Sequence, residues 1–376
     1  VSDTHNLGSK PHSAMAIFAV TVGAIAVGGA AIAYKRKAAE VEEVPKKMRR
    51  LVLMEANKDL SKAKLEVQVV ETPKPRSGQV LVKVAAAPVN PSDDGVWKEP
   101  PKMGYPMPLG NEGSGKVVAS GGGLAASYLL GKNVAFTGQS YAEYAVVDAM
   151  KGVFSLPSDA PVEDACAFFV NPFTVVGIVD TVRSSGGKAF IHTAAASQLG
   201  QMLVKYCKQE GMTLVNVVRR KEQVKLLEQL GAEHIIDTSS PTWSAELETL
   251  IRDLKIKHAF DCIAGETSGT LLKMMPPGSS LWVYGRLSKD PVGNIDPLDL
   301  IYRGKKVQGW FLPGWMFNGG LISALRRSIR TAKTVRGHLS TVFASDFKDS
   351  QLENLHRDYT ALQATGATGS KLRVRP

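Results

Sequence analysis

The chain has 376 residues, enough for two domains that each bury a core. Its composition, 44% hydrophobic and 22% charged, excludes a disordered or fibrous chain. Lys and Arg outnumber Asp and Glu by 46 to 35, a net charge of +11, but no recognition motif or basic–aromatic stripe supports binding to nucleic acid.

The first expected element is an uncharged stretch, "MAIFAVTVGAIAVGGAAIAY", at residues 15–34. Twenty helical residues span about 30 Å, the thickness of a hydrocarbon core. The cluster of positive residues, Lys35, Arg36 and Lys37, comes after the stretch rather than before it, which predicts a membrane span and not a secretory signal. We therefore expect a tail at 1–13, a transmembrane helix at 14–34 and a basic linker at 35–48 that suits anionic headgroups.

Small residues recur four apart within this stretch, as at Ala19 and Gly23. Such spacing lets membrane helices approach closely, so we expect other membrane-protein subunits as partners besides the bilayer at 15–34. Alanine and glycine that merely fill a lone anchor would give the same pattern, and this alternative stays open.

Short alternating runs begin at residue 49, and their pattern is that of β-strands. Runs such as "RLVLME", "QVLVKVAAAPVN" and "KNVAFTG" are separated by Gly, Pro, Asn and Asp, as all-β domains require. We therefore expect a β-rich domain over residues 49–170.

From residue 171 onward, strands and helices alternate. Near-continuous apolar runs such as "KAFIHTA", "TLVNVV" and "SSLWVYG" are separated by amphipathic stretches such as "KEQVKLLEQL". This alternation predicts a parallel sheet covered by helices on both faces. We expect a doubly wound domain over 171–304 and a segment, 305–376, that returns to complete the β-rich domain. The expected fold class is thus α/β.

The stretch "HTAAASQLGQ", residues 192–201, lies where an apolar strand turns into a helix. Dinucleotide loops need a tight turn, close backbone approach and a helix N-terminus aimed at the pyrophosphate. Counted back from Gly200, this loop keeps the third, helix-packing glycine and has Ala195 and Ser197 in place of the first two. The hydroxyls of Thr193 and Ser197 are candidate donors to phosphate oxygens. Alone, the stretch also fits an ordinary strand-to-helix corner.

Two arginines come after the next apolar run, "TLVNVV". An NAD-binding domain usually places Asp or Glu here, to accept a hydrogen bond from the ribose 2′-hydroxyl. Arg219 and Arg220 instead match a 2′-phosphate, because guanidinium groups bind phosphate oxygens bidentately. The alternative is a solvated first turn of helix, although cations there oppose the helix dipole. The sequence predicts NADPH as the cofactor.

Several stretches, in this order, resemble the medium-chain dehydrogenase/reductase superfamily. They are "APVNPSD" (87–93), "GNEGSG" (110–115), "NPFT" (171–174), "TAAASQLGQ", "NVVRRKEQ", "LGAEHIID", "VYG" (283–285) and "GWFLPGW" (309–315). Over about residues 49–376 the chain is similar to the zinc-free quinone-oxidoreductase branch, and especially to the mitochondrial 2-enoyl thioester reductases. The resemblance implies a GroES-like catalytic domain, a Rossmann domain and NADPH in the cleft between them.

The resemblance also implies which residues contact the cofactor. Asn90 and Thr174 would lie near the nicotinamide, and Lys371 would reach the cofactor from the C-terminal end. Asn90 could instead form the turn before a proline, and Trp310 and Phe311 suit core packing equally well. The implied cofactor-binding residues are Asn90, Thr174, Ala195, Ala196, Ser197, Gln198, Leu199, Gly200, Arg219, Arg220, Tyr284, Gly285, Trp310, Phe311 and Lys371.

The chain departs from the family pattern in two places. The zinc branch has Gly-His-Glu where this chain has Gly110, Asn111 and Glu112, and the three cysteines lie far apart, so we expect no zinc. Thioester reductases carry a tyrosine in the interval "DGVWKEPPKMGYPMPL", where this chain has only Tyr105. Asn90 and Tyr105 are the candidate catalytic residues, although the place of Tyr105 beside Gly110 fits packing at a strand edge better.

Two functions remain open from the sequence. One is a membrane-anchored NADPH-dependent oxidoreductase of quinones or of α,β-unsaturated carbonyl and enoyl thioester compounds. The other is a non-catalytic or weakly active accessory subunit of a mitochondrial inner-membrane respiratory complex that retains the nucleotide-binding fold. The cofactor motifs favour the first, and the predicted transmembrane helix favours the second.

We expect the protein in the mitochondrial inner membrane, with its folded domains on the matrix side. The basic composition, the resemblance and a first residue, Val1, that is not Met and so implies a removed targeting segment all favour this location. A plastid membrane is the alternative.

Overall fold

The computed structural model describes residues 43–364 and 370–376. The predicted tail, the transmembrane helix at 14–34 and most of the basic linker lie outside the described residues. Within the described ranges, the segment Asp164–Ser184 is long and apolar enough to cross a membrane, but 83% of its most apolar window is buried inside the fold. It belongs to the protein core.

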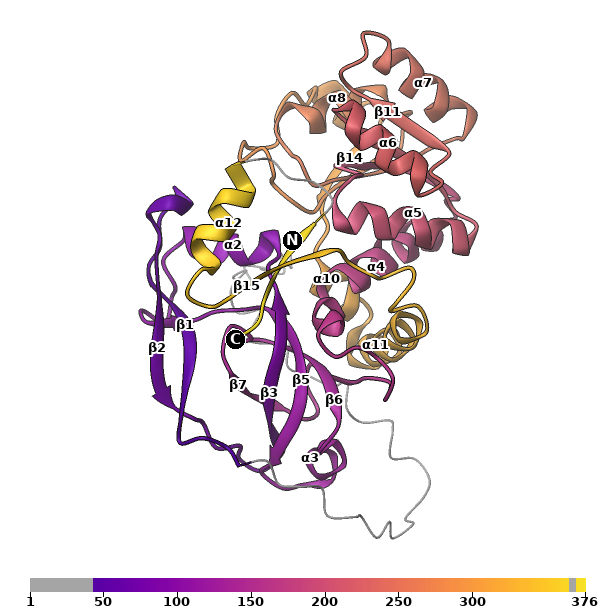
Figure 1. The fold of residues 1–376 in the computed structure, drawn as a ribbon. Helices are drawn as coiled ribbons and strands as arrows, with labels where there is room; N and C mark the ends of the chain where they lie inside the picture. The colour runs from indigo at the N-terminus through magenta and orange to yellow at the C-terminus, as the bar shows by residue number, and fades with distance from the viewer. Residues whose placement is uncertain (1–42, 365–369) are drawn as a thin grey trace, which may run out of the picture.

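The first domain is β-rich, as the sequence predicts (Figure 1). Its long central strand β3 pairs antiparallel with β5 and β7, and β5 continues to β6 and β8. A smaller sheet, in the order β2-β1-β4, lies beside it. The elements are β1 (Lys47–Glu55), η1 (Leu60–Lys62), β2 (Lys64–Glu71), β3 (Gln79–Pro88), α2 (Pro91–Lys98), β4 (Met107–Pro108), β5 (Glu112–Ser120), α3 (Leu124–Leu129), β6 (Asn133–Thr137), β7 (Tyr144–Asp148), β8 (Val153–Ser155) and η2 (Asp164–Ala167).

The second domain is the doubly wound unit that the alternating pattern predicts. Its six strands are parallel and lie in the order β11-β10-β9-β12-β13-β14, which is the order of a Rossmann sheet. The elements are α4 (Val170–Ser184), β9 (Ala189–Thr193), α5 (Gln198–Glu210), β10 (Thr213–Val218), α6 (Lys221–Gln229), β11 (His234–Asp237), α7 (Trp243–Asp253), β12 (His258–Asp261), α8 (Glu266–Met274), β13 (Ser280–Val283), α9 (Pro297–Ile301), β14 (Lys306–Gly309), α10 (Leu312–Phe317) and α11 (Gly320–Gly337).

Helices cover both faces of this sheet. Successive strand residues point to opposite sides, so Phe190 packs in the cluster with α4 and α5, while Ile191 packs with α7 and α8. This double coverage explains why the strands are apolar along their whole length and do not alternate.

The C-terminal segment departs from the boundary expected at residue 305. β14 is the sixth strand of the parallel sheet, and α10 and α11 pack against α4, so the chain stays with the second domain to residue 337. β14 is a four-residue edge strand, KVQG, with a single apolar residue, so sequence reasoning merged it with the C-terminal segment. The return to the first domain is made by β15 (Phe347–Ser350), α12 (Leu355–Ala364) and β16 (Lys371–Val374), where β16 pairs with β3 (Figure 1).

Candidate nucleotide site and buried polar cluster

The loop before α5 has the close packing that a dinucleotide loop requires. Ser197 caps the helix, because its hydroxyl accepts a hydrogen bond from the amide of Gly200 at 3.2 Å. A Cβ at Gly200 would lie 2.1 Å from the carbonyl oxygen of Ala195, so only glycine fits there. The loop therefore comes very close to the helix, and the N-terminus of α5 opens at the carboxyl edge of the sheet.

The sequence comparison places Ala195 at the position of the first glycine in the turn, but the left-handed residue lies one position earlier. Ala194, not Ala195, has a positive φ, +49°, the left-handed conformation that normally favours glycine. Thr193 also differs from expectation. Its hydroxyl is buried and donates to the Asp261 carboxylate at 2.8 Å, so it cannot serve a phosphate. The Ser197 hydroxyl only accepts a hydrogen bond in the helix cap, so its own proton is available to donate to another group.

The two predicted phosphate-binding arginines come directly after β10, on the strand next to the loop. Arg219 is exposed and forms no ion pair within residues 43–364 and 370–376, and its amide donates to the Gln223 side chain. Arg220 is the N-cap residue of α6. Both lie at the same carboxyl edge as the loop, since β9 and β10 are parallel neighbours.

A histidine–tyrosine pair, with His192 buried and Tyr284 half-buried, spans the same edge. His192 of β9 and Tyr284, directly after β13, have stacked rings with centroids 5.9 Å apart, and Nε2 lies 2.6 Å from the tyrosine hydroxyl. Burial lowers the pKa of His192 to about 3, so its imidazole is neutral, and burial raises the pKa of Tyr284 well above its usual value. The pair is therefore uncharged, and it fixes the Tyr284 ring at the carboxyl edge of the sheet.

Sequence reasoning missed His192 and Asp261, although each interrupts an apolar run, "KAFIHTA" and "KHAFDCIA". The buried Asp261 carboxylate accepts from the Thr193 and Ser268 hydroxyls and from the amides of Ile263 and Ala264. These bonds hold the loop after β12 in place. That loop lies against Gly285, where a Cβ would be 2.8 Å from the Cys262 oxygen.

Asn90 and Lys371, both predicted to lie near the nicotinamide, contact each other in the first domain. The Lys371 ammonium donates to Asn90 Oδ1 at 2.6 Å, and Asn90 Nδ2 donates to Glu112 Oε1 at 2.9 Å. The other Glu112 oxygen accepts from the amides of Phe169 and Val170, at the N-terminus of α4. The carboxylate suits that position because it complements the helix dipole. This cluster joins the β-rich domain to the first helix of the Rossmann domain.

Asp93 adds a second carboxyl group to the cluster. It is buried and accepts from the Asn90 amide at 2.8 Å. Burial raises the pKa of Asp93 to about 7, with Glu112 adding to the rise and Lys371 opposing it. Burial also lowers the pKa of Lys371. The Asp93 carboxyl therefore titrates close to neutral pH.

Tyr105 lies apart from these groups. It is 42% exposed, and its hydroxyl accepts from the Ala56 amide at 2.9 Å, next to the end of β1. Its side chain holds the loop before β4 against that strand, a packing role at a sheet edge. Since Asn90 is 1% exposed and two of its side-chain bonds are already made, it retains one amide N–H for a further partner.

Three further residues predicted to contact the cofactor are Thr174, Trp310 and Phe311. Thr174 is buried in α4, where its hydroxyl donates to the Val170 carbonyl. Trp310 is 7% exposed and donates to Thr181, and its ring lies where a Cβ at Gly177 would be, which is core packing. Phe311 is 52% exposed at the start of α10.

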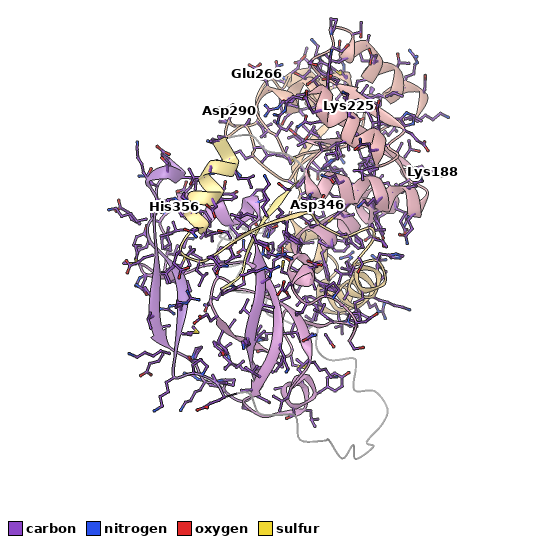
Figure 2. The ribbon with its side chains drawn as sticks, in the orientation of Figure 1. Lys188, Lys225, Glu266, Asp290, Asp346 and His356 are labelled. Atoms are coloured by element: carbon purple, nitrogen blue, oxygen red, sulfur yellow. The ribbon has the colours of Figure 1, made fainter. Side chains whose placement is uncertain are left out.

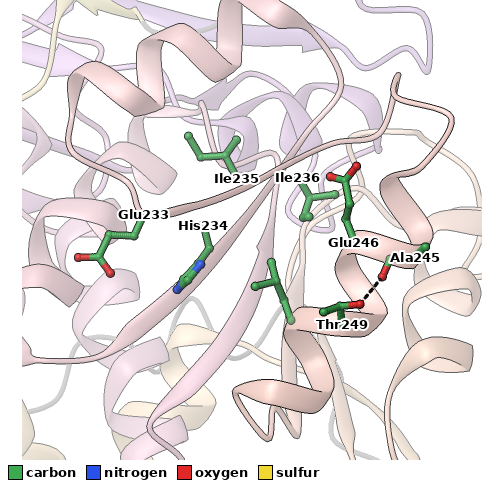
Figure 3. A pocket seen from close by; sticks show the side chains of 8 residues that line it. Glu233, His234, Ile235, Ile236, Ala245, Glu246 and Thr249 are labelled. Carbon is green, nitrogen blue, oxygen red and sulfur yellow. Dashed lines mark hydrogen bonds between the residues drawn. The ribbon is translucent and has the colours of Figure 1, made fainter.

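A hollow of about 500 Å³ lies on another part of the second domain, between β11 and α7 (Figure 3). His234, Ile236 and Thr249 are among its lining residues, and it is open to solvent. Its lining includes neither the loop before α5 nor any residue of the Asn90–Glu112–Lys371 cluster.

Comparisons with known proteins agree with the two-domain division. Residues 76–158 match the family described as alcohol dehydrogenase GroES-like domain, and residues 199–327 match the family described as zinc-binding dehydrogenase. The mitochondrial enoyl-[acyl-carrier-protein] reductase of Mus musculus is 30% identical over 268 residues, which cover 68% of this chain and 69% of the relative.

Two solved structures share the fold. A putative NADPH:quinone reductase from Mesorhizobium loti has a TM-score of 0.74 and 29% identity, covering 89% of this chain and 100% of the other. The Etr1p/NADP/crotonyl-CoA complex has a TM-score of 0.70 at 18% identity, covering 88% and 100%.

A GroES-like domain joined to a Rossmann domain defines a dehydrogenase/reductase type of protein. The chain belongs to the medium-chain dehydrogenase/reductase superfamily, and within it the chain is similar to the mitochondrial enoyl-acyl-carrier-protein reductases. One family description names zinc, yet the part of the chain that the structure describes contains no group of three His, Cys, Asp or Glu able to hold a metal. The resemblance implies the first cysteine ligand of the zinc branch near Asn90, and Asn90 here bonds the ammonium of Lys371.

Proposed function

We propose that the protein is an NADPH-dependent reductase of quinones or of α,β-unsaturated carbonyl compounds, enoyl thioesters included. The observation that carries the proposal is the carboxyl edge of the Rossmann sheet, where the tight loop before α5 and the exposed Arg219 come after neighbouring strands. Relatives named as enoyl reductases and a neighbour named as a putative NADPH:quinone reductase support it.

The residues of this edge fit the phosphates of the cofactor. The first amides of α5 have no acceptor within the helix and would hold the pyrophosphate, while Ser197 offers its hydroxyl proton. Arg219 would bind the 2′-phosphate, which compensates a cation placed near the N-terminus of α6. When bound, NADPH would supply the hydride.

The buried cluster would orient the acceptor. Asn90 has one amide N–H left, and the neighbouring Lys371 ammonium polarises that amide through its oxygen. An acceptor carbonyl at this N–H would be held for attack at its electron-poor carbon. In this scheme solvent supplies the proton, since the Tyr105 side chain is held against Ala56 at the end of β1.

A second candidate is an accessory subunit of a mitochondrial inner-membrane respiratory complex, with little or no catalysis. The observation that favours it is that both candidate catalytic side chains, Asn90 and Tyr105, already make structural hydrogen bonds. In this alternative, NADPH stabilises the fold. In both, residues 14–34 anchor the protein in the inner membrane with the folded domains in the matrix; the relatives named as mitochondrial support the mitochondrial part of this placement.

Turnover separates the two candidates. The full chain in detergent micelles is mixed with NADPH and either a short-chain quinone or an enoyl thioester, and NADPH loss is measured by absorbance. The reductase proposal expects steady-state turnover with at least one acceptor. Asn90→Ala should lower kcat at least tenfold, because a tenfold loss corresponds to a rise of only about 1.4 kcal/mol in the activation barrier, less than orientation of the acceptor can contribute. NADPH binding without turnover with any acceptor would leave the accessory-subunit candidate.

A further inference from the structure

Helix α11 has an outward face unlike that of an ordinary solvated helix. Its buried side consists mostly of small residues, such as Ala324, Ser328 and Ala332, with Val335 near its end. Three larger aliphatic residues of the helix, Leu321, Ile322 and Ile329, are exposed, and Ile322 is 68% exposed. Globular helices normally bury their large apolar side chains, so this face is suited to a contact outside the described chain.

The exposed stripe of α11 combines aliphatic and cationic side chains. Ile322, Arg326, Ile329, Lys333 and Arg336 recur at intervals of four and three residues and are all exposed. This spacing aligns them along one side of the helix for about 20 Å. The helix as a whole contains five Lys or Arg residues and no Asp or Glu.

The cations of this stripe are not neutralised by the protein itself. Arg326, Lys333 and Arg336 form no ion pair in the described parts of the chain, whereas Arg330, on the neighbouring row, pairs with Asp180 at 3.0 Å. An amphipathic face with aliphatic residues between unpaired cations is the kind of surface that binds anionic lipid.

Helix α3 extends this face. Tyr128 of α3 is a neighbour of Arg336, whose pKa is lowered by partial burial, and the ammonium of Lys132 lies 3.1 Å from the centroid of the Tyr128 ring. Leu124, at the start of α3, is 83% exposed. An exposed tyrosine between two cations suits the headgroup region of a bilayer, where one side of the ring is apolar and its hydroxyl is wet.

The chain enters the described structure at this end of the molecule. Val44 packs against the cluster that contains Leu81, which pairs with Ala119 near the end of β5, and β5 is followed by α3 (Figure 1). The uncharged stretch 15–34 ends nine residues before Glu43, a reach of about 30 Å if fully extended. The folded domains are thus held close to whatever contains that stretch.

We propose that the stripe of α11, with Tyr128 of α3, docks on the surface of an anionic phospholipid bilayer, the same one that holds residues 15–34. Docking fixes the orientation of the two domains relative to the membrane. It is independent of the reductase proposal, because none of these residues belongs to the nucleotide edge or to the buried polar cluster.

Fluorescence quenching tests the proposal on the full chain. The three native cysteines are buried, so Ile322→Cys accepts a thiol-reactive fluorophore selectively. The labelled protein is placed in nanodiscs of phosphatidylcholine alone or of phosphatidylcholine with phosphatidylglycerol. Lipid-borne quencher and aqueous iodide report whether position 322 lies against lipid or in water.

Charge reversal supplies the matched comparison. The variant Arg326→Glu/Lys333→Glu/Arg336→Glu removes the stripe's cations, and Lys225→Glu/Lys255→Glu/Lys273→Glu makes the same change in net charge on exposed residues of the other end of the Rossmann domain, where Figure 2 shows Lys225. Thermal unfolding checks that both variants fold.

The proposal expects lipid quenching and iodide shielding in the anionic discs only. Each cation near an anionic surface changes the docked-to-free ratio about fivefold, so the stripe variant lowers it more than ~100-fold and the control variant leaves it unchanged. Equal quenching in both kinds of disc, or equal loss in both variants, overturns the proposal. Shielding that occurs only in native membrane extracts, and not in anionic discs, also overturns it and assigns the face to a protein partner.

Discussion

Replacing Gly200 by alanine tests the geometry of the loop before α5. The added Cβ would lie 2.1 Å from the Ala195 oxygen and 2.6 Å from its carbonyl carbon, while ordinary contact begins at 3.4 Å. The obstacle is backbone, which is also fixed by the bond from the Ala195 amide to the Val217 carbonyl, so no side-chain rotation relieves it. The loop and α5 must move apart before the new methyl group fits.

We expect Gly200→Ala to cost about 3 kcal/mol, the upper part of the range for overpacked sites, because backbone must move. The moved helix N-terminus should also weaken NADPH binding at least tenfold, about 1.4 kcal/mol. Gly211→Ala is the matched control at the other end of α5, where φ is +63° and nothing lies within 4 Å of the new Cβ. It should cost about 1 kcal/mol and leave NADPH affinity unchanged.

Both variants are measured in detergent micelles, by chemical denaturation for stability and by calorimetric titration for NADPH. A Gly200→Ala protein that loses less than about 0.5 kcal/mol, or that binds NADPH as the parent does, would refute the account of the loop. If Gly211→Ala lost as much NADPH affinity, the loss in Gly200→Ala would come from destabilisation of α5 as a whole and not from the loop.

Three further predictions concern neighbouring groups. Ala194→Gly should stabilise the protein by up to about 1 kcal/mol in denaturant titration, because glycine relieves the positive φ at this residue; destabilisation would contradict that reason. Asp93 has a folded pKa of about 7, above its unfolded value of about 3.9, so its contribution to stability is present at low pH and is lost as pH rises from about 4 to 7. The difference in unfolding free energy between Asp93→Asn and the parent should therefore shift in favour of the variant as pH rises from about 4 to 7. A difference that stays constant across this window would contradict the shifted pKa. His192→Phe should cost about 1–3 kcal/mol by removing the histidine partner of the Tyr284 hydroxyl, and His192→Phe/Tyr284→Phe should recover most of it; equal losses in the single and double variants would mean that the bond contributes nothing.

The sequence predicts the two domains well because each has a strong local pattern. Alternation of apolar strands with amphipathic helices indicates a parallel sheet, and the glycine, proline and asparagine punctuation indicates the β-rich part. The position of the loop before α5 also follows from local signals, namely a strand, small residues and a helix-packing glycine.

The contacts that join distant parts of the chain could not be predicted in this way. Lys371 and Asn90 are 281 positions apart, and Thr193 and Asp261 are 68 apart. No periodicity links such pairs, because sheet topology alone brings them together. β14 was assigned to the wrong segment for the same reason, since an edge strand of four residues carries little pattern of its own.

The central claim is that Arg219 selects the 2′-phosphate at the edge of the Rossmann sheet. Calorimetric titration of NADPH and NADH into the full chain and into Arg219→Asp tests it most directly. We expect the parent to bind NADPH more tightly than NADH, and the variant to lose at least tenfold in NADPH affinity, about 1.4 kcal/mol, with NADH affinity nearly unchanged. Equal loss of both nucleotides in the variant, or no binding of either to the parent, would contradict the claim.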